Sequence, residues 1–332
     1  MRRAPFAALV LGSALTGALV LHFGGDAVIR SLFAIGWRGF AAIVLVHLGL
    51  IAAMGIAWWV LLPGTSPFAA IWGRLVRDSA SEVLPLSQVG GYVAGARAIS
   101  GAGVAGTDAA ASTIVDVTLE FLAQLAYTGL ALALLIDLRP ESPVVAAVAA
   151  GLAVATVLAA GFLVAQRRGF SLVARAAGYG WAGRMGNGAA ALHRAIGAAY
   201  RRRRRIAASF ALHLGCWIAG AGEVWLALRL AGAPLGFGPV LAIEGLLYAV
   251  RSVAFAVPNA AGVQEGAYIL IGAGFGLSPE MALALSLLKR ARDLIIGLPV
   301  LGAWQLAEAG CFRPRAAGRQ AAAVPPVQPG TS

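Results

Sequence analysis

The sequence predicts an all-α, polytopic integral membrane protein: a helical bundle with about eight crossings and two broken or re-entrant segments. Hydrophobic residues make up 60% of the 332 residues and charged residues only 12%, whereas an ordinary soluble domain is nearer half apolar and a quarter charged. The mean hydropathy is +0.81. The chain also contains several apolar stretches of about 20 residues, the length that crosses a bilayer.

The apolar stretches define the predicted spans. Charge-poor stretches predict crossings at residues 4–23, 39–62, 109–136, 143–166, 206–228, 239–257 and 280–306. A short apolar piece, 267–277, is counted as the eighth crossing. Seven crossings, or six with re-entrant pieces, are the alternatives.

The basic residues predict the topology. The net charge is +12, and the basic residues lie mostly between apolar stretches, as the positive-inside rule expects. Residues 167–205 hold ten Arg and no acid, which predicts a cytoplasmic loop. The basic tail, 307–332, is expected to be disordered and cytoplasmic, as is the N-terminus with Arg2 and Arg3. A nucleic-acid partner is not expected, because no soluble element would present the charge. Five consecutive residues are expected to contact anionic lipid: Arg201, Arg202, Arg203, Arg204 and Arg205.

Two segments break the helical pattern. Pro and Gly interrupt residues 63–107 and 258–266, and irregular backbone at membrane depth is tolerated only where protein or a wet cavity covers it. Each segment contains Gln-x-Gly-[Gly/Ala]-Tyr after a proline, starting at Gln88 and at Gln264. Paired interrupted segments in two halves indicate a transporter binding site. We therefore expect one transmembrane domain, 1–306, with an internal repeat of 1–166 and 206–306; a chance match in a Gly-rich chain is the alternative.

Charged residues within the apolar spans are the candidates for chemistry. Each costs about 2.5–3.5 kcal/mol at the bilayer centre, so they should pair or face a water-filled cavity. Asp116 and Glu120 share a helix face and need either a cation nearby or a proton on one acid; Arg251 or the basic residues of 289–292 could supply the cation. A salt-bridge network that only joins helices is the alternative. We expect no cofactor and no metal, because the sequence lacks nucleotide-loop and metal-ligand spacing.

The second broken segment resembles a known family. The run from Pro258 through Gly262, Gln264, Glu265 and Gly266 to Tyr268, followed by Leu288-Lys-Arg-Ala-Arg-Asp293, resembles the lysylphosphatidylglycerol synthase transmembrane family, also called flippase-like. Pro85, Gly90 and Gly91 with Arg97 resemble its first-half motif. The nearest resemblance is to the hopanoid-associated, HpnL-type branch.

The resemblance implies a bacterial inner-membrane protein that moves a lipid between leaflets, with hopanoids or phospholipids as cargo. It marks Glu265, Arg97, Arg290 and Arg292 as characteristic polar positions. It does not imply aminoacyl transfer, because the synthase members carry a soluble transferase domain after the membrane part. We therefore do not expect an enzyme.

Two further functions stay open: a membrane enzyme that modifies a lipid head group, with Asp116 and Glu120 as acid and base, and a scaffold that gathers lipid-synthesis enzymes. The sequence does not fix the oligomeric state. The residues expected to form a substrate path are Arg77, Glu82, Gln88, Gly90, Gly91, Arg97, Asp116, Glu120, Glu244, Arg251, Pro258, Gly262, Gln264, Glu265, Gly266, Arg290, Arg292 and Asp293.

Overall fold

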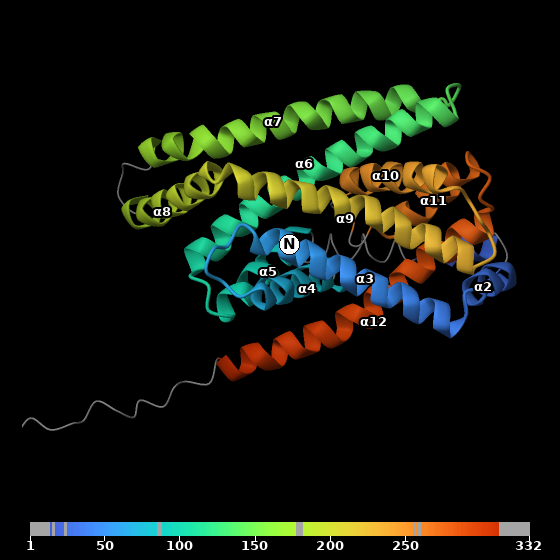
Figure 1. Ribbon diagram of the computed structural model, residues 1–332, viewed down its shortest axis with the longest axis horizontal. Coiled ribbons are helices and arrows are strands. Elements are labelled where there is room, and N and C mark those ends of the chain that lie inside the picture. Colours follow the sequence, from blue (N-terminus) through green and yellow to red (C-terminus); the bar gives the residue numbers. More distant parts are fainter. Residues whose placement is uncertain are drawn as a thin grey trace, which may run out of the picture.

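The computed structural model describes residues 14, 17–22, 25–84, 88–176, 182–254, 257 and 260–311, and the regular structure within them is entirely helical (Figure 1). This confirms that the protein is all-α, as predicted. The helices are α2 (Gly25–Phe33), α3 (Gly36–Trp59), α4 (Pro67–Val83), α5 (Gln88–Gly101), α6 (Gly106–Leu138), α7 (Val144–Ala176), α8 (Ala182–Arg201), α9 (Arg203–Leu230), α10 (Phe237–Val253), α11 (Val263–Ala273) and α12 (Pro279–Cys311).

Within the described part of the chain, four helices are long and apolar enough to cross a membrane: α3, α6, the Val145–Gln166 part of α7, and α9. They correspond to the spans predicted at 39–62, 109–136, 143–166 and 206–228. Most of the span predicted at 4–23 lies outside the described residues. The 11 residues of α11 extend roughly 16 Å at 1.5 Å per residue. The crossing predicted at 267–277 is therefore too short to span a bilayer unaided.

Two boundaries differ from the sequence prediction. The Arg-rich segment 167–205, expected as a loop, is mostly helical, because α7 continues to Ala176 and α8 leads almost directly into α9. Alanine is frequent in this segment and favours helix. In the same way α12 continues to Cys311, beyond the tail boundary predicted at 307, and residues 312–332 lie outside the described part of the chain.

Both predicted broken segments are broken in the structure. Residues 63–107 form the short helices α4 and α5, which pack against each other. The second break follows α10. Gly262, the residue before α11, has a φ of +76°, a left-handed conformation that glycine adopts without strain. Pro258 lies outside the described residues.

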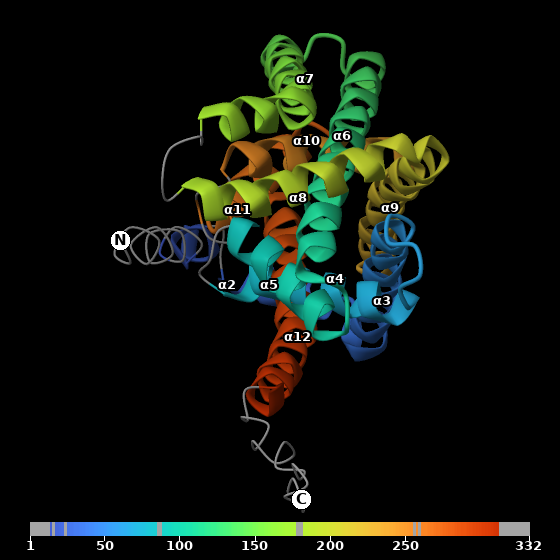
Figure 2. The same cartoon turned by 90° about the vertical axis from the view of Figure 1, so that its left-hand side faces the viewer.

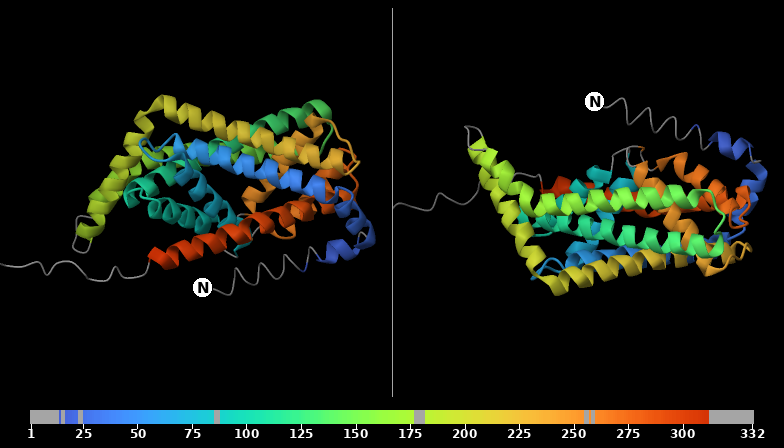
Figure 3. Two further views of the ribbon diagram at one scale, coloured as in Figure 1. Left: turned by 60° about the horizontal axis from the view of Figure 1, so that its bottom comes forward. Right: turned by 90° about the horizontal axis from the view of Figure 1, so that it is seen from above.

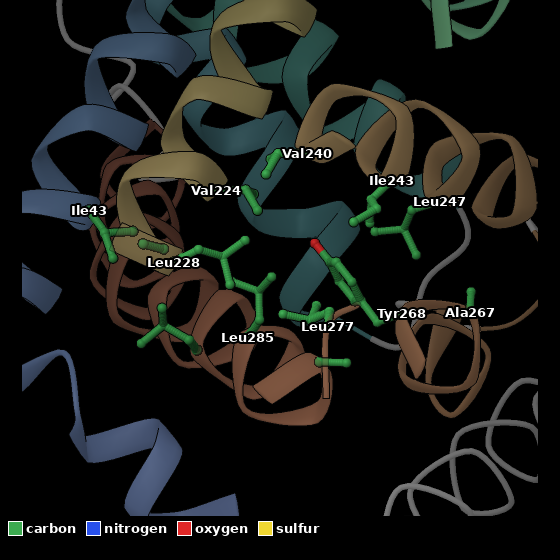
Figure 4. Close-up of a cluster of buried hydrophobic side chains, with 13 residues drawn as sticks. Ile43, Val224, Leu228, Val240, Ile243, Leu247, Ala267, Tyr268, Leu277 and Leu285 are labelled. Carbon is green, nitrogen blue, oxygen red and sulfur yellow. The ribbon is translucent and has the colours of Figure 1, made fainter. Parts of the chain in front are cut away.

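The largest apolar cluster joins α3, α9, α10, α11 and α12 around Tyr268, whose side chain is fully buried (Figure 4). By contrast, α7 lies at the edge of the bundle, against α6 and α8 (Figures 1 and 2). Its side chains Val154, Val157 and Leu158 are more than half exposed. Such an apolar outer face is suited to lipid contact.

A similar succession of helix lengths occurs twice along the chain. The helices α3, α4, α5 and α6 contain 24, 17, 14 and 33 residues, and α9, α10, α11 and α12 contain 28, 17, 11 and 33. Long helices of both sets lie side by side, as α3 does with α9 (Figure 3). The short helices α4, α5, α10 and α11 are the ones that flank the breaks.

Close packing of α4 on α5 requires glycine at position 91. A Cβ atom there would lie 1.9 Å from the Ser81 hydroxyl and 2.7 Å from the Arg77 backbone oxygen. We expect Gly91→Ala to destabilise the protein by about 1–3 kcal/mol through overpacking, measured by SDS titration in mixed micelles. Gly266→Ala is the control, because a Cβ at that helical position meets nothing within 4 Å. Equal stabilities of the two variants would contradict the packing argument.

Candidate functional site

A cavity of about 420 Å³ lies among α3, α4, α5, α6, α9, α10 and α12. Part of its lining is apolar and includes Leu50, Ile51, Val117 and Phe121. The rest is charged, with Arg74, Arg77, Arg251, Lys289 and Arg292 facing Asp78, Glu82, Glu120, Glu223 and Asp293. The volume lies within the usual range for small-molecule sites. The cavity therefore offers both a polar and a hydrocarbon-like surface to one ligand.

The first charged cluster joins α4 to α6. The guanidinium of Arg74 donates to both Glu120 oxygens, at 3.0 and 2.7 Å, and to Asp78 at 2.7 Å. Arg77 donates to Glu120 and, at 2.8 Å, to Asp116. Bidentate pairs of this kind are the stronger charge-assisted hydrogen bonds. Two cations thus neutralise the carboxylates that share one face of α6.

Asp116 also contacts a buried histidine. The Nε2 atom of His213, on α9, lies 2.9 Å from Asp116 Oδ1, and both side chains are fully buried. Hydrogen bonding is the role that we expect for a histidine within an apolar span. The contact ties α9 to α6 behind the cavity.

The second charged cluster joins α12 to α9 and α3. Arg292 donates to Glu223 and, at 2.7 Å, to its neighbour Asp293. His47 Nδ1 lies 2.8 Å from Glu223, and its Nε2 lies 3.9 Å from Asp293. His47 and His213 each contact a carboxylate of a helix far from their own in sequence.

Next to this cluster, Lys289 Nζ donates to Glu244 at 2.8 Å and to the Tyr268 hydroxyl at 2.9 Å. The Tyr268 hydroxyl in turn donates to Glu244. Glu244 is 1% exposed, so removal of either charge would leave the other buried without its partner, which typically costs about 3–5 kcal/mol.

An ion pair between Arg251 and Glu82 connects α10 to α4. Arg251 donates to both Glu82 oxygens, at 2.8 and 3.0 Å, and to Gln264 Oε1 at 2.7 Å. Arg251 and Glu82 lie near the C-terminal ends of their helices, just before the two breaks. This pair links the helices α3–α6 to the helices α9–α12.

Of the residues predicted to form a substrate path, the structure brings seven to the cavity: Arg77, Glu82, Gln88, Glu120, Arg251, Arg292 and Asp293. Asp116, Glu244 and Gln264 are buried and hold cavity-lining cations. Gly91 serves the packing of α5 on α4, and Gly90 lies beside it in the same helix.

Arg97 and Glu265 do not line the cavity. Arg97 is 53% exposed and pairs with Glu308 at 2.8 Å. Glu265 accepts the Gly262 backbone N–H at 2.8 Å and the Arg290 Nε–H at 2.6 Å. Glu265, Gly262 and Arg290 therefore fix the start of α11 against α12, and Gly266 follows in that helix.

The proposed cation for Asp116 and Glu120 was wrong. The sequence favoured Arg251 or the basic residues of 289–292, whereas Arg74 and Arg77 of the broken segment make these contacts. Sequence reasoning also left out of the path four charged residues and one histidine that line the cavity: Arg74, Asp78, Glu223, Lys289 and His47. Their charge or ionisable ring within or beside an apolar helix was the available signal.

Arg201 to Arg205 are exposed and lie where α8 meets α9. Arg205 donates to the Val60 carbonyl at 3.1 Å. Among the described residues, no group of three or more His, Cys, Asp or Glu side chains is placed to hold a metal ion.

The family model described as the lysylphosphatidylglycerol synthase TM region matches residues 6–300. The chain belongs to this family. With its apolar helices, this makes it a multi-pass membrane protein. No curated protein and no solved structure matches this chain significantly.

The buried network should be more sensitive to charge removal than the surface pair. We expect Glu120→Gln to destabilise the protein by on the order of 3 kcal/mol, because Arg74 and Arg77 lose a shared buried carboxylate. Glu308→Gln, in the exposed pair with Arg97, should cost about 0–1 kcal/mol. Unfolding in mixed micelles measures both; a Glu308 effect as large as that of Glu120 would contradict the assignment.

Proposed function

We propose that this protein translocates lipids between the leaflets of its membrane. The observation that carries the proposal is the cavity, which combines a charged surface with an apolar one among membrane-type helices. A lipid that changes leaflet keeps its tail in hydrocarbon but needs polar partners for its head group. The cavity supplies both environments within one site.

The paired charges support this function. A charge within a bilayer must pair or contact water, and the carboxylates and cations of the cavity already satisfy one another. These paired side chains can therefore stay inside the membrane domain while no ligand occupies the cavity. A polar head group can then exchange hydrogen bonds with them.

We also propose that α3–α6 and α9–α12 are two structural repeats within the predicted halves. Their helix lengths match, and equivalent positions carry ionisable groups. Counted from Pro67 and Phe237, Arg74 and Glu244 are each the eighth residue of their helix; counted from Gly106 and Pro279, Asp116 and Lys289 are each the eleventh. A binding site between repeats that contain broken helices is typical of secondary transporters.

The cargo that we propose is a hopanoid or a related lipid of a bacterial inner membrane, because the sequence resembles the hopanoid-associated branch. Polyol head groups can both donate to carboxylates and accept from guanidinium groups. We further propose that Arg201 to Arg205 contact anionic head groups at the cytoplasmic surface, and that lipid-synthesis enzymes act as partners.

Hopanoid distribution between the leaflets tests the cargo. Cells that lack the gene should keep their total hopanoid composition and show a shifted ratio between inner and outer leaflet, measured by extraction of the outer leaflet and mass spectrometry. Loss or covalent change of a hopanoid species without a leaflet shift would contradict translocation and indicate head-group modification.

Filling the cavity should stop transport. Gly220 lines the cavity, and a Cβ there meets nothing within 4 Å, so Gly220→Leu should place its side chain in the cavity and block the site. We expect at least about a tenfold lower rate of leaflet exchange in proteoliposomes, because an occluded site cannot bind its ligand. Gly215→Leu is the matched control, since Gly215 is on the same helix, is exposed and also meets open space. Equal exchange by the two variants would exclude this cavity as the path.

A further inference from the structure

We infer that the cavity selects lipid head groups that carry no net charge and that both donate and accept hydrogen bonds. Arg251 and Glu82 are the ion pair that binds the head group. Zwitterionic and uncharged polyol head groups share this chemistry. The inference rests on the proposed function in that it takes the ligand to be a membrane lipid.

The charge balance of the cavity is the first argument. Among the described residues, the lining carries five Arg or Lys side chains and five carboxylates. Each of these cations bonds to at least one acid, either a lining carboxylate or the buried Asp116 or Glu244. An added anion would therefore have to take a cation from its carboxylate. That carboxylate would then lose its ion pair inside the protein, which is unfavourable.

The exposure of the ion pairs is the second argument. Arg251 is 13% exposed and Glu82 is 23% exposed. The other four lining cations are only 4–6% exposed. A ligand in the cavity therefore reaches Arg251 more readily than the other cations. Glu82 is accessible from the same space.

The support behind Arg251 is the third argument. Gln264 accepts from Arg251 at 2.7 Å and itself donates to Ser286 at 2.8 Å. The Tyr248 ring lies 5.8 Å from the guanidinium carbon. These contacts do not involve Glu82, so Arg251 keeps its position when Glu82 turns to a ligand.

A neutral head group can enter this pair and still leave each charged side chain with a hydrogen-bond partner. Its phosphate or hydroxyl oxygen accepts from Arg251, and its ammonium or hydroxyl group donates to Glu82. One ion pair is thereby replaced by two hydrogen-bonded contacts. Because Arg251 lies on α10 and Glu82 on α4, the same exchange releases a direct link between the two sets of helices.

Transport of three labelled lipids tests the inference. The protein is reconstituted in phosphatidylcholine vesicles with trace acyl-labelled phosphatidylethanolamine, glucosyldiacylglycerol or phosphatidylglycerol, and dithionite bleaching reports leaflet exchange. We expect at least one of the two neutral lipids to exchange about tenfold faster than phosphatidylglycerol, because only the anion adds an uncompensated negative charge to the cavity. The ratio between the two neutral lipids distinguishes a zwitterion from a polyol. Equal or faster exchange of phosphatidylglycerol would overturn the inference.

A charge-removing variant sharpens the test. Glu82→Gln leaves Arg251 with spare positive charge, so the preference against phosphatidylglycerol should shrink severalfold. The control Glu308→Gln removes a carboxylate from the pair with Arg97 outside the cavity and should keep the wild-type ratio. An unchanged ratio in Glu82→Gln would overturn the role of this pair.

Retention of lipids by the purified protein separates this inference from the proposed function. Native mass spectrometry after incubation with equal amounts of the three lipids should show a neutral lipid retained over phosphatidylglycerol. Such retention without any leaflet exchange would contradict translocation and leave the head-group preference intact. Preferential retention of phosphatidylglycerol would overturn the preference whether or not transport occurs.

Discussion

Mutual neutralisation of buried charges is the constraint on which this structure depends. Arg74, Arg77, Asp116 and Glu120 would each be costly within a bilayer, and they are acceptable because they form one hydrogen-bonded cluster. The pairing fixes more than charge. A guanidinium with two carboxylate partners defines the distance and rotation of its helix relative to theirs. This network therefore helps to fix the position of α4 relative to α6.

The charged residues and the breaks in the helices lie in the same region, and each makes the other possible inside the protein. Short helices such as α4 and α5 leave polar backbone groups at their ends, which need protein or water around them. The ion pair between Arg251 and Glu82 lies beside both breaks and helps to keep that region polar. Glycine at position 91 then allows α5 to approach α4 closely enough to cover the charged residues from the other side. One small residue and one ion pair thus stabilise the same irregular region.

The sequence predicted the helices better than it predicted which charged side chains pair with one another. Hydropathy predicted α3, α6, α7 and α9, because a long apolar run in a bilayer has one stable conformation. The acids of α6 were also evident, since Asp116 and Glu120 stand out in an apolar run. Their partners were not predictable: Arg74 and Arg77 belong to a different helix, and only the folded arrangement, in which these long side chains reach α6, selects them over Arg251. Family-type motifs were similarly ambiguous, because Glu265 fixes a helix start while Arg292 lines the cavity.

Differences in exposure assign different roles to ion pairs of the same chemistry. Lys289 and Glu244 are almost fully buried, so they can exchange partners only when the helices around them move. Arg251 and Glu82 face the cavity and can exchange partners with a ligand while the surrounding helices remain packed. A ligand that satisfies both charges substitutes for the link between α10 and α4 and lowers the cost of separating them. Binding and helix movement would then be coupled through one ion pair, because a ligand shifts a conformational equilibrium only by its difference in affinity for the two states.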